Sequence, residues 1–313
     1  MMAPKILITD GLEEDGQSIL RAAAVVEDRS GITAADLPAA VAGCHAIIVR
    51  GRTRVTGEVL ESADSLKVVG RAGVGVDNID LVAAKKHGVV VVNAPTATTN
   101  AVAELAFGLL LSMAREIPRA DAGLKAGNWI KQELLGVELS GKTLGIIGYG
   151  RIGMEMGKRA SAFGMNVIAY DPFIPESHIR AGGAESVSIQ DLFGWSDFIS
   201  LHLPYDVKSR DLIGPQAFSQ MKDGVRIVCA ARGGILDEAA LLSALDTGKV
   251  AAVALDVFAE EPPGRTALIQ HPRVIATPHI GAQTVESQRR AAADIANEVV
   301  AALRGEPLRW RVA

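Results

Sequence analysis

The sequence predicts an α/β protein made of two doubly wound domains, each a parallel sheet covered by helices. Short apolar runs alternate with helix-forming segments over almost the whole chain, which is the pattern of βαβ units. A glycine-rich turn, residues 148–153, follows one apolar run and precedes a helical pattern. The length of 313 residues is enough for two domains of ordinary size. In such folds we expect a cleft at the carboxyl ends of the strands, between the two domains.

Composition excludes several classes of protein. Hydrophobic residues make up 49% and charged residues 22% of the chain, and 32 basic against 36 acidic residues give a net charge of −4. Without a long basic run, nucleic acid is not an expected partner. No apolar stretch reaches about 18 residues, so no membrane span is expected, and no signal-peptide profile opens the chain, which favours a cytoplasmic location. Cys44 and Cys229 have no metal-like spacing; we expect both in the core and no bound metal.

The first third of the chain reads as a small α/β domain. We assign residues 1–97, together with 285–313, to a substrate-binding domain. The expected strands are Lys5–Thr9, Val25–Asp28, Ala46–Val49, Lys67–Gly70 and Val89–Asn93. The expected helices are Asp15–Ala24, Ala34–Val41, Gly57–Ser62, Asp80–His87 and a final amphipathic helix, Thr284–Leu303.

Residues 98–284 are assigned to a dinucleotide-binding domain. A single long helix is expected over Ala101–Lys125, and its apolar content favours burial against a partner subunit. In the irregular segment that follows, Trp129 and Leu134-Leu135 are expected to be exposed, which favours a homodimer or a tetramer; core packing is the alternative. The expected strands are Thr143–Ile147, Asn166–Tyr170, Phe198–His202, Arg226–Ala230, Ala251–Leu255 and Val274–Ala276.

The turn Gly148-Tyr149-Gly150-Arg151-Ile152-Gly153 carries the Rossmann-like dinucleotide fingerprint, since it connects a strand to the helical segment Met154–Phe163. Gly148 permits the sharp turn, Gly150 lets the backbone approach a pyrophosphate, and Gly153 permits close packing of helix and strand. The helix N-terminus offers free N–H groups to the phosphates. Asp171, 18 residues beyond Gly153, ends the next strand and suits the ribose hydroxyls. A carboxylate there repels a 2′-phosphate, so the expected cofactor is NAD rather than NADP.

Three later strand ends carry unusual polar residues: Arg232, the acidic pair Glu260-Glu261, and His279. Taken alone, each has an ordinary structural explanation, as a solvated arginine, a turn carboxylate or a structural histidine. Together they suit hydride transfer on a small 2-hydroxy acid. Arginine grips a carboxylate through its planar fork, histidine accepts the hydroxyl proton near neutral pH, and a carboxylate fixes the histidine tautomer.

These motifs make the chain resemble the D-isomer-specific 2-hydroxyacid dehydrogenase family over essentially its whole length. The resemblance implies that Arg232 binds substrate, that His279 is the acid/base, and that Glu261 orients His279. It implies cofactor contacts at Val74, Gly148, Gly150, Arg151, Ile152, Gly153, Asp171, Leu203, Ala230, Ala231, Arg232, Asp256, His279, Gly281 and Ala282. Val74 stands where many relatives carry threonine, so one hydrogen bond is expected to be missing.

Within that family the chain most resembles the branch that oxidises 3-phosphoglycerate with NAD. The implied substrate contacts are Arg50, Gly51, Arg71, Ala72, Gly73, Arg232 and His279, with Arg50 and Arg71 on a substrate phosphate. Arg52 and Arg54 have a second interpretation as solvated loop charges. The alternatives are a glyoxylate or hydroxypyruvate reductase, more distantly a phosphonate or D-lactate dehydrogenase, and a corepressor-like protein that only senses NAD. Since the sequence ends at Ala313, soon after its last helix, regulation by a C-terminal serine-binding domain is not expected.

Overall fold

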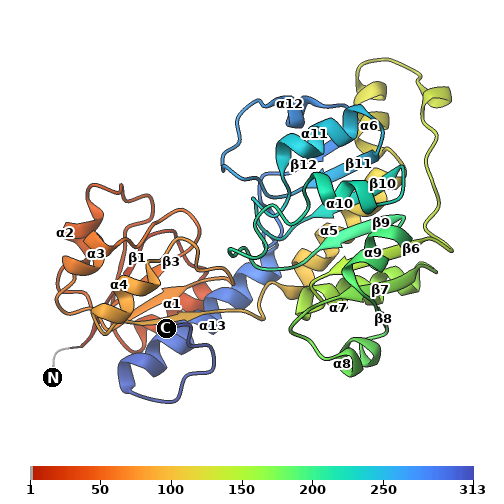
Figure 1. The fold of residues 1–313 in the computed structure, drawn as a ribbon. Helices are drawn as coiled ribbons and strands as arrows, with labels where there is room; N and C mark the ends of the chain where they lie inside the picture. The colour runs from red at the N-terminus through yellow and green to blue at the C-terminus, as the bar shows by residue number, and fades with distance from the viewer. Residues whose placement is uncertain (1–2) are drawn as a thin grey trace. The chain divides into compact units, whose positions relative to one another are not determined.

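The computed structural model describes residues 3–313 and divides the chain into two compact units. The first comprises Met1–Thr98 and Ala282–Ala313, and the second comprises Thr99–Gly281. Each unit contains one sheet in which every pair of neighbouring strands is parallel (Figure 1). The predicted fold class, two doubly wound α/β units, is confirmed.

The first unit is a five-stranded sheet in the order β2-β1-β3-β4-β5. Its strands are β1 (Lys5–Ile8), β2 (Val25–Asp28), β3 (Ala46–Val49), β4 (Val68–Arg71) and β5 (Val90–Asn93). Its helices are α1 (Glu14–Arg21), α2 (Leu37–Val41), α3 (Gly57–Glu61), α4 (Leu81–Lys86) and α13 (Val285–Arg304).

Helices cover both faces of this sheet, as the apolar runs require. Leu20 of α1 packs with Ile295 and Val299 of α13 on one face, and α2, α3 and α4 bury their apolar residues on the other. The carboxyl ends of β1, β3 and β4 lie next to one another in the sheet. The loops after these three strands therefore meet at one edge, although they are far apart in sequence.

The second unit is a seven-stranded sheet in the order β12-β11-β10-β9-β6-β7-β8. Its strands are β6 (Thr143–Ile147), β7 (Asn166–Tyr170), β8 (Glu185–Ser186), β9 (Phe198–Leu201), β10 (Val225–Cys229), β11 (Val250–Leu255) and β12 (Val274–Ala276). Its helices are α5 (Thr99–Ala114), α6 (Ile117–Lys125), the 3₁₀ turn η1 (Lys131–Glu133), α7 (Arg151–Ala162), α8 (Glu176–Ala181), α9 (Ile189–Trp195), α10 (Pro215–Gln220), α11 (Glu238–Asp246) and α12 (Ala267–Gln270).

The single helix expected over Ala101–Lys125 was wrong: the structure has two helices, α5 and α6. The break lies at Glu116, which adopts a left-handed backbone with φ 52°. Pro118 has no N–H to donate to Ala114, whose carbonyl accepts from the Val137 N–H at 2.8 Å instead. The apolar residues of α5 lie in the core of their own unit, so they need no partner subunit.

Two smaller differences concern the sheet that carries the fingerprint. Helix α7 begins at Arg151, three residues before the expected start, so the last glycine of the fingerprint lies in its first turn. Strand β8 was not expected, because two residues with polar side chains give no apolar run. Cys44 and Cys229 are both buried free thiols, as predicted, and burial raises the pKa of Cys229 to about 11.

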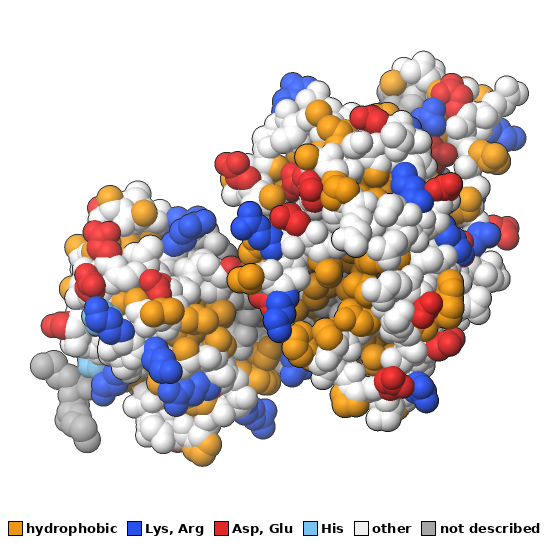
Figure 2. Space-filling view, in the orientation of Figure 1, with side chains coloured by type: hydrophobic (Ala, Val, Ile, Leu, Met, Phe, Trp, Pro, Cys, Tyr) orange, Lys and Arg blue, Asp and Glu red, His pale blue; other side chains and the backbone are white. Residues whose placement is uncertain are grey.

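The visible surface carries acidic and basic side chains interspersed, without a large patch of one sign (Figure 2). None of the helices described between residues 3 and 313 has the length and apolar character needed to cross a bilayer.

Candidate active site

Three loops with polar residues follow three neighbouring strands of the second unit. Arg232 follows β10, Glu261 lies in the loop after β11, and His279 follows β12. Because β12, β11 and β10 are adjacent and parallel, their carboxyl ends meet at one edge of the sheet. The fold thus brings together three residues that span about fifty positions of sequence.

The imidazole of His279 is bonded to the carboxylate of Glu261. The distance between Nδ1 and Oε2 is 2.7 Å, and Oε1 of Glu261 accepts the Phe258 N–H at 3.1 Å. An ionised carboxylate only accepts hydrogen bonds, so the proton of the neutral imidazole lies on Nδ1. The lone pair of Nε2 is then available to take a proton, on a side chain that is 49% exposed.

Asp256 organises the loop that carries His279. Its buried carboxylate accepts three hydrogen bonds from that loop: Thr277 Oγ1 at 2.7 Å and Ile280 N–H at 2.9 Å on Oδ1, and Gly281 N–H at 2.8 Å on Oδ2. Its backbone carbonyl accepts the His279 N–H at 2.9 Å. His279 itself has φ 51°, a left-handed conformation that non-glycine residues rarely adopt. Asp256 was predicted as a cofactor contact; its role in fixing this loop was missed.

Gly233 lets the loop that carries Arg232 lie against the loop that carries Glu261. A Cβ on Gly233 would lie 1.7 Å from the Phe258 carbonyl oxygen, so only glycine lets the Arg232 loop touch the loop that carries Glu261. Arg232 donates from Nη1 to the Ala231 carbonyl at 2.6 Å. The positive charge of Arg232 contributes to lowering the pKa of the Glu261 carboxyl.

The pKa of Glu261 is lowered from its usual value of 4.5. Burial alone raises that pKa, but the hydrogen bond and charge of His279, the Phe258 N–H and the Arg232 guanidinium together outweigh burial. The carboxylate is therefore ionised at neutral pH and ready to accept the Nδ1 proton.

Because this pKa is lower in the folded state, the stabilisation it gives is present above pH 4.5 and is lost as pH falls through the depressed value. We expect Tm of the wild type to exceed that of Glu261→Gln near neutral pH, and the difference to shrink as pH falls below 4.5. Thermal melts of both proteins across this range test it. A difference that stays constant with pH contradicts the assignment.

The fingerprint turn has the geometry that a dinucleotide needs. Gly148 has φ 90°, and a Cβ there would lie 2.5 Å from the His202 carbonyl oxygen. Gly150 is the N-cap of α7 without a side-chain cap, and a Cβ there would meet nothing within 4 Å. The first turn of α7 therefore presents N–H groups beside open space, which suits a pyrophosphate.

Asp171 closes the same turn. Its Oδ2 accepts the Tyr149 N–H at 2.8 Å and its Oδ1 accepts the Phe173 N–H at 2.9 Å. Each oxygen keeps a further lone pair for a ribose hydroxyl. This carboxylate and the open N-terminus of α7 fit NAD.

Replacing Asp171 with alanine is expected to relax the preference for NAD over NADP, since the charge that repels a 2′-phosphate is lost. The ratio of kcat/KM for the two cofactors measures this, with Tm recorded because two backbone N–H groups lose their acceptor. If NADP use stays negligible in a folded variant, another group enforces the choice.

Of the other predicted cofactor residues, several lie in strand-end loops of the second unit. The N–H of Leu203 is 3.1 Å from the Cβ position of Gly148, Ala230 and Ala231 are buried after β10, and Gly281 is held by Asp256. Val74 and Ala282 belong to the first unit. His202 was not predicted: its Nε2 is 2.8 Å from Ser200 Oγ, and burial lowers its pKa to about 4, so it is neutral.

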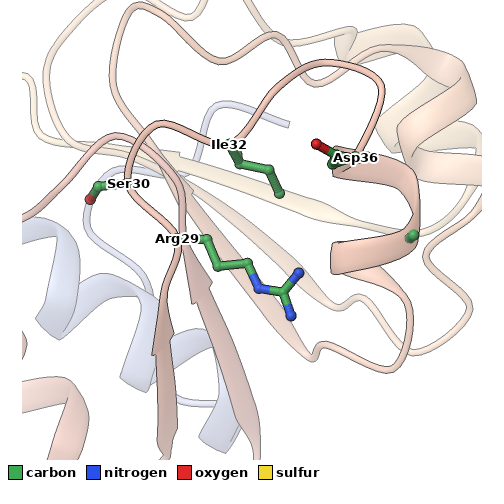
Figure 3. A pocket seen from close by; sticks show the side chains of 5 residues that line it. Arg29, Ser30, Ile32 and Asp36 are labelled. Atoms are coloured by element: carbon green, nitrogen blue, oxygen red, sulfur yellow. The ribbon is translucent and has the colours of Figure 1, made fainter.

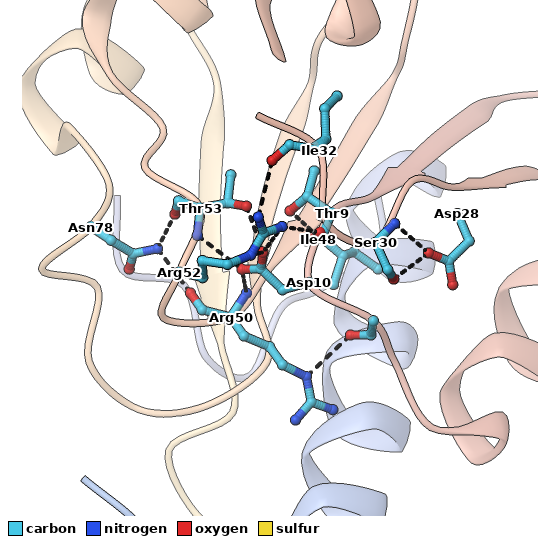
Figure 4. A network of polar contacts seen from close by, with 11 residues as sticks. Thr9, Asp10, Asp28, Ser30, Ile32, Ile48, Arg50, Arg52, Thr53 and Asn78 are labelled. Carbon is cyan, nitrogen blue, oxygen red and sulfur yellow. Dashed lines mark hydrogen bonds and ion pairs between the residues drawn. The ribbon is translucent and has the colours of Figure 1, made fainter. Parts of the chain in front are cut away.

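The predicted substrate residues of the first unit also gather at one sheet edge. The Arg71 guanidinium lies over Gly73: a Cβ placed on Gly73 would be 1.7 Å from Nη1 of Arg71. A Cβ placed on Gly51 would be 4.0 Å from Nη2 of the same guanidinium. The N–H of Ala72 donates to the Val49 carbonyl at 2.9 Å. Nε of Arg50 donates to the Gly11 carbonyl at 3.1 Å (Figure 4). The Arg50 guanidinium also pairs with Glu13.

The remaining arginines of this loop, Arg52 and Arg54, are both exposed, but Arg52 is also held by several hydrogen bonds. Arg52 donates to Asp10, to the Ile32 carbonyl at 3.0 Å and to the Thr9 carbonyl at 2.6 Å (Figure 4). Arg54 is exposed.

A cavity of about 420 Å³ lies elsewhere on the first unit, beyond β2. It is lined by Arg29, Ser30, Ile32, Asp36 and Ala39 (Figure 3). None of these is a predicted site residue, and Arg29 is paired with Glu27.

Comparison with known proteins agrees with this geometry. Residues 107–281 match the family model "D-isomer specific 2-hydroxyacid dehydrogenase, NAD binding domain". The chain belongs to the D-isomer-specific 2-hydroxyacid dehydrogenase family. The predicted resemblance is confirmed, and so is NAD as the cofactor of the domain that carries the fingerprint.

Individual members of the family extend the comparison. The chain is 49% identical to D-3-phosphoglycerate dehydrogenase 2, chloroplastic, of Arabidopsis thaliana, covering 97% of this chain and 49% of that protein. It is 49% identical to D-3-phosphoglycerate dehydrogenase of Methanocaldococcus jannaschii, covering 96% and 58%. A glyoxylate reductase structure from Paecilomyes thermophila is 32% identical with a TM-score of 0.91, covering 100% and 99%. The chain thus spans about half the length of these two curated relatives.

Proposed function

We propose that the chain oxidises D-3-phosphoglycerate to 3-phosphohydroxypyruvate with NAD⁺, the first step of L-serine biosynthesis. The chemistry is carried by one observation, the 2.7 Å bond between His279 Nδ1 and Glu261. The choice of substrate is supported by relatives named D-3-phosphoglycerate dehydrogenase at 49% identity.

When bound, NAD⁺ accepts the hydride that leaves the hydroxyl-bearing carbon. His279 takes the hydroxyl proton on Nε2, which leaves a 2-oxo acid. Glu261 holds the ring and stabilises the imidazolium that forms. The Arg232 guanidinium binds the substrate carboxylate through two of its N–H groups. Arg50 and Arg71 are assigned to the substrate phosphate.

The second candidate is a glyoxylate or hydroxypyruvate reductase, in which the same residues act in the reverse direction. One observation favours it: the Arg50 guanidinium already forms an ion pair with Glu13 of this chain. A protein that only senses NAD is disfavoured by the intact Glu261–His279 pair.

The deciding experiment is NADH oxidation with 3-phosphohydroxypyruvate, hydroxypyruvate, glyoxylate and pyruvate side by side. We expect kcat/KM to favour the phosphorylated acid by tenfold or more, about 1.4 kcal/mol of transition-state binding. A larger kcat/KM for an unphosphorylated acid points to the reductase. Binding of NADH without turnover of any acid points to a sensor.

We also propose a homodimer, with a tetramer as the alternative. The segment from α6 to Leu135 exposes Ile117 (51%), Leu124 (61%), Trp129 (78%) and Leu135 (88%). Exposed apolar side chains in one segment are typical of protein interfaces. Sedimentation of the purified chain measures the oligomer. A cytoplasmic location is proposed from the two buried free cysteines.

A further inference from the structure

The carboxylate of Glu13 forms an ion pair with the guanidinium of Arg50 at the edge of the first sheet. Nη2 of Arg50 pairs with Oε2 of Glu13, and the Arg50 side chain is 19% exposed. Arg50 is also the residue assigned to the substrate phosphate. A phosphate that binds Arg50 must therefore compete with a carboxylate of this chain.

The backbone of Arg50 is fixed, so the competition concerns only the end of its side chain. The Arg50 N–H donates to Asp10 Oδ2 at 2.8 Å, and Asn78 Nδ2 donates to the Arg50 carbonyl at 2.8 Å (Figure 4). Asp10 also holds Arg52 and Thr53, and its side chain is only 4% exposed. This carboxylate has no freedom to change partner.

Glu13 differs from Asp10 in its exposure and in the number of partners that hold its carboxylate. Its side chain is 32% exposed, and it makes no capping bond to α1 although it stands at the N-cap position. It lines a solvent-open cavity of about 470 Å³ together with Glu14, Asp15 and residues 283–285, 288 and 289. Leaving Arg50 therefore returns the Glu13 carboxylate to water rather than burying it unpaired.

We propose that Glu13 is a specificity-determining residue that holds Arg50 until a phosphorylated substrate displaces it. The inference rests on the proposed function. A phosphate dianion carries more charge and more acceptor oxygens than a carboxylate, so it outcompetes Glu13 for the planar fork of Arg50. A substrate without a phosphate leaves the Arg50–Glu13 pair intact and gains nothing from Arg50.

The test is Glu13→Gln, which keeps the shape of the side chain and removes its charge. We expect KM for 3-phosphohydroxypyruvate to fall about two- to fivefold, the range that a partly exposed ion pair supports. The kcat and the KM for hydroxypyruvate are expected to stay unchanged. Measurements belong in a phosphate-free buffer of low ionic strength, because salt screens the pair.

Two further variants make the result specific. Glu14→Gln removes the same charge from the next residue, whose partner is Arg21 at 2.8 Å, and is expected to change neither KM. In an Arg50→Gln background, Glu13→Gln is expected to have no effect on KM, because the group it frees is gone. An unchanged or higher KM for the phosphorylated acid in Glu13→Gln overturns the proposal, and so does an equal fall for both acids.

A second readout does not depend on turnover. Inorganic phosphate is expected to raise Tm of Glu13→Gln more than Tm of the wild type, since ligand binding stabilises the folded state. If no phosphorylated acid is turned over, the proposed function fails, and the phosphate-dependent Tm still tests the ion pair. Equal phosphate shifts in the wild type, Glu13→Gln and Glu14→Gln overturn the proposal.

Discussion

Replacement of His279 by alanine is expected to lower kcat by at least about 10²-fold, the usual scale for losing a general acid/base. The hydroxyl proton then has no acceptor at the position of Nε2, while the fingerprint turn and Asp171 remain in place. NADH binding should therefore persist. Steady-state kinetics on the preferred acid and fluorescence titration with NADH measure the two effects separately.

His87→Ala is the matched control, because this histidine is exposed at the end of α4 and belongs to no predicted site. Its kcat is expected to equal that of the wild type. A near-normal kcat in His279→Ala would show that His279 is not the acid/base, even though its Nδ1 lies 2.7 Å from Glu261 Oε2.

The second large effect is expected from Gly153→Ala in the fingerprint turn. A Cβ at this position would lie 2.2 Å from the Gly148 carbonyl oxygen and 3.2 Å from Ile146 Cγ2. The turn or the start of α7 must shift, and strain of this kind costs about 1–3 kcal/mol. We expect NADH affinity to fall by about tenfold or more, since each 1.4 kcal/mol is a factor of ten.

Gly108→Ala provides the comparison, since Gly108 is also a helical glycine of the second unit. A Cβ there would meet nothing within 4 Å, and alanine favours the helix over glycine. Its NADH affinity should stay at the wild-type value, with Tm equal or higher. NADH affinity of Gly153→Ala within twofold of the wild type would show that the turn tolerates a side chain.

Much of the fold could be predicted because it depends on short-range patterns. Short, mostly apolar runs of three to six residues between helical segments predicted the strands of both sheets except β8, whose two residues form no such run. The fingerprint was recognisable because glycines at fixed spacing meet steric needs that no other residue meets. The break at Glu116 could have been predicted from Pro118, which cannot donate to the preceding turn.

The sequence by itself therefore determined the fold class, the NAD fingerprint and the strand ends that carry Arg232, Glu261 and His279. The tertiary structure determined which charged side chains form ion pairs with one another. Glu13 and Arg50 are 37 positions apart, and nothing in their local sequence distinguishes Glu13 from Asp10, Glu14 or Asp15 as the partner of Arg50. Burial of α5 within its own unit, and the hold of Asp256 on the His279 loop, were likewise invisible. Periodicity is encoded between near neighbours, whereas an ion pair depends on distances that exist only after the strands have assembled.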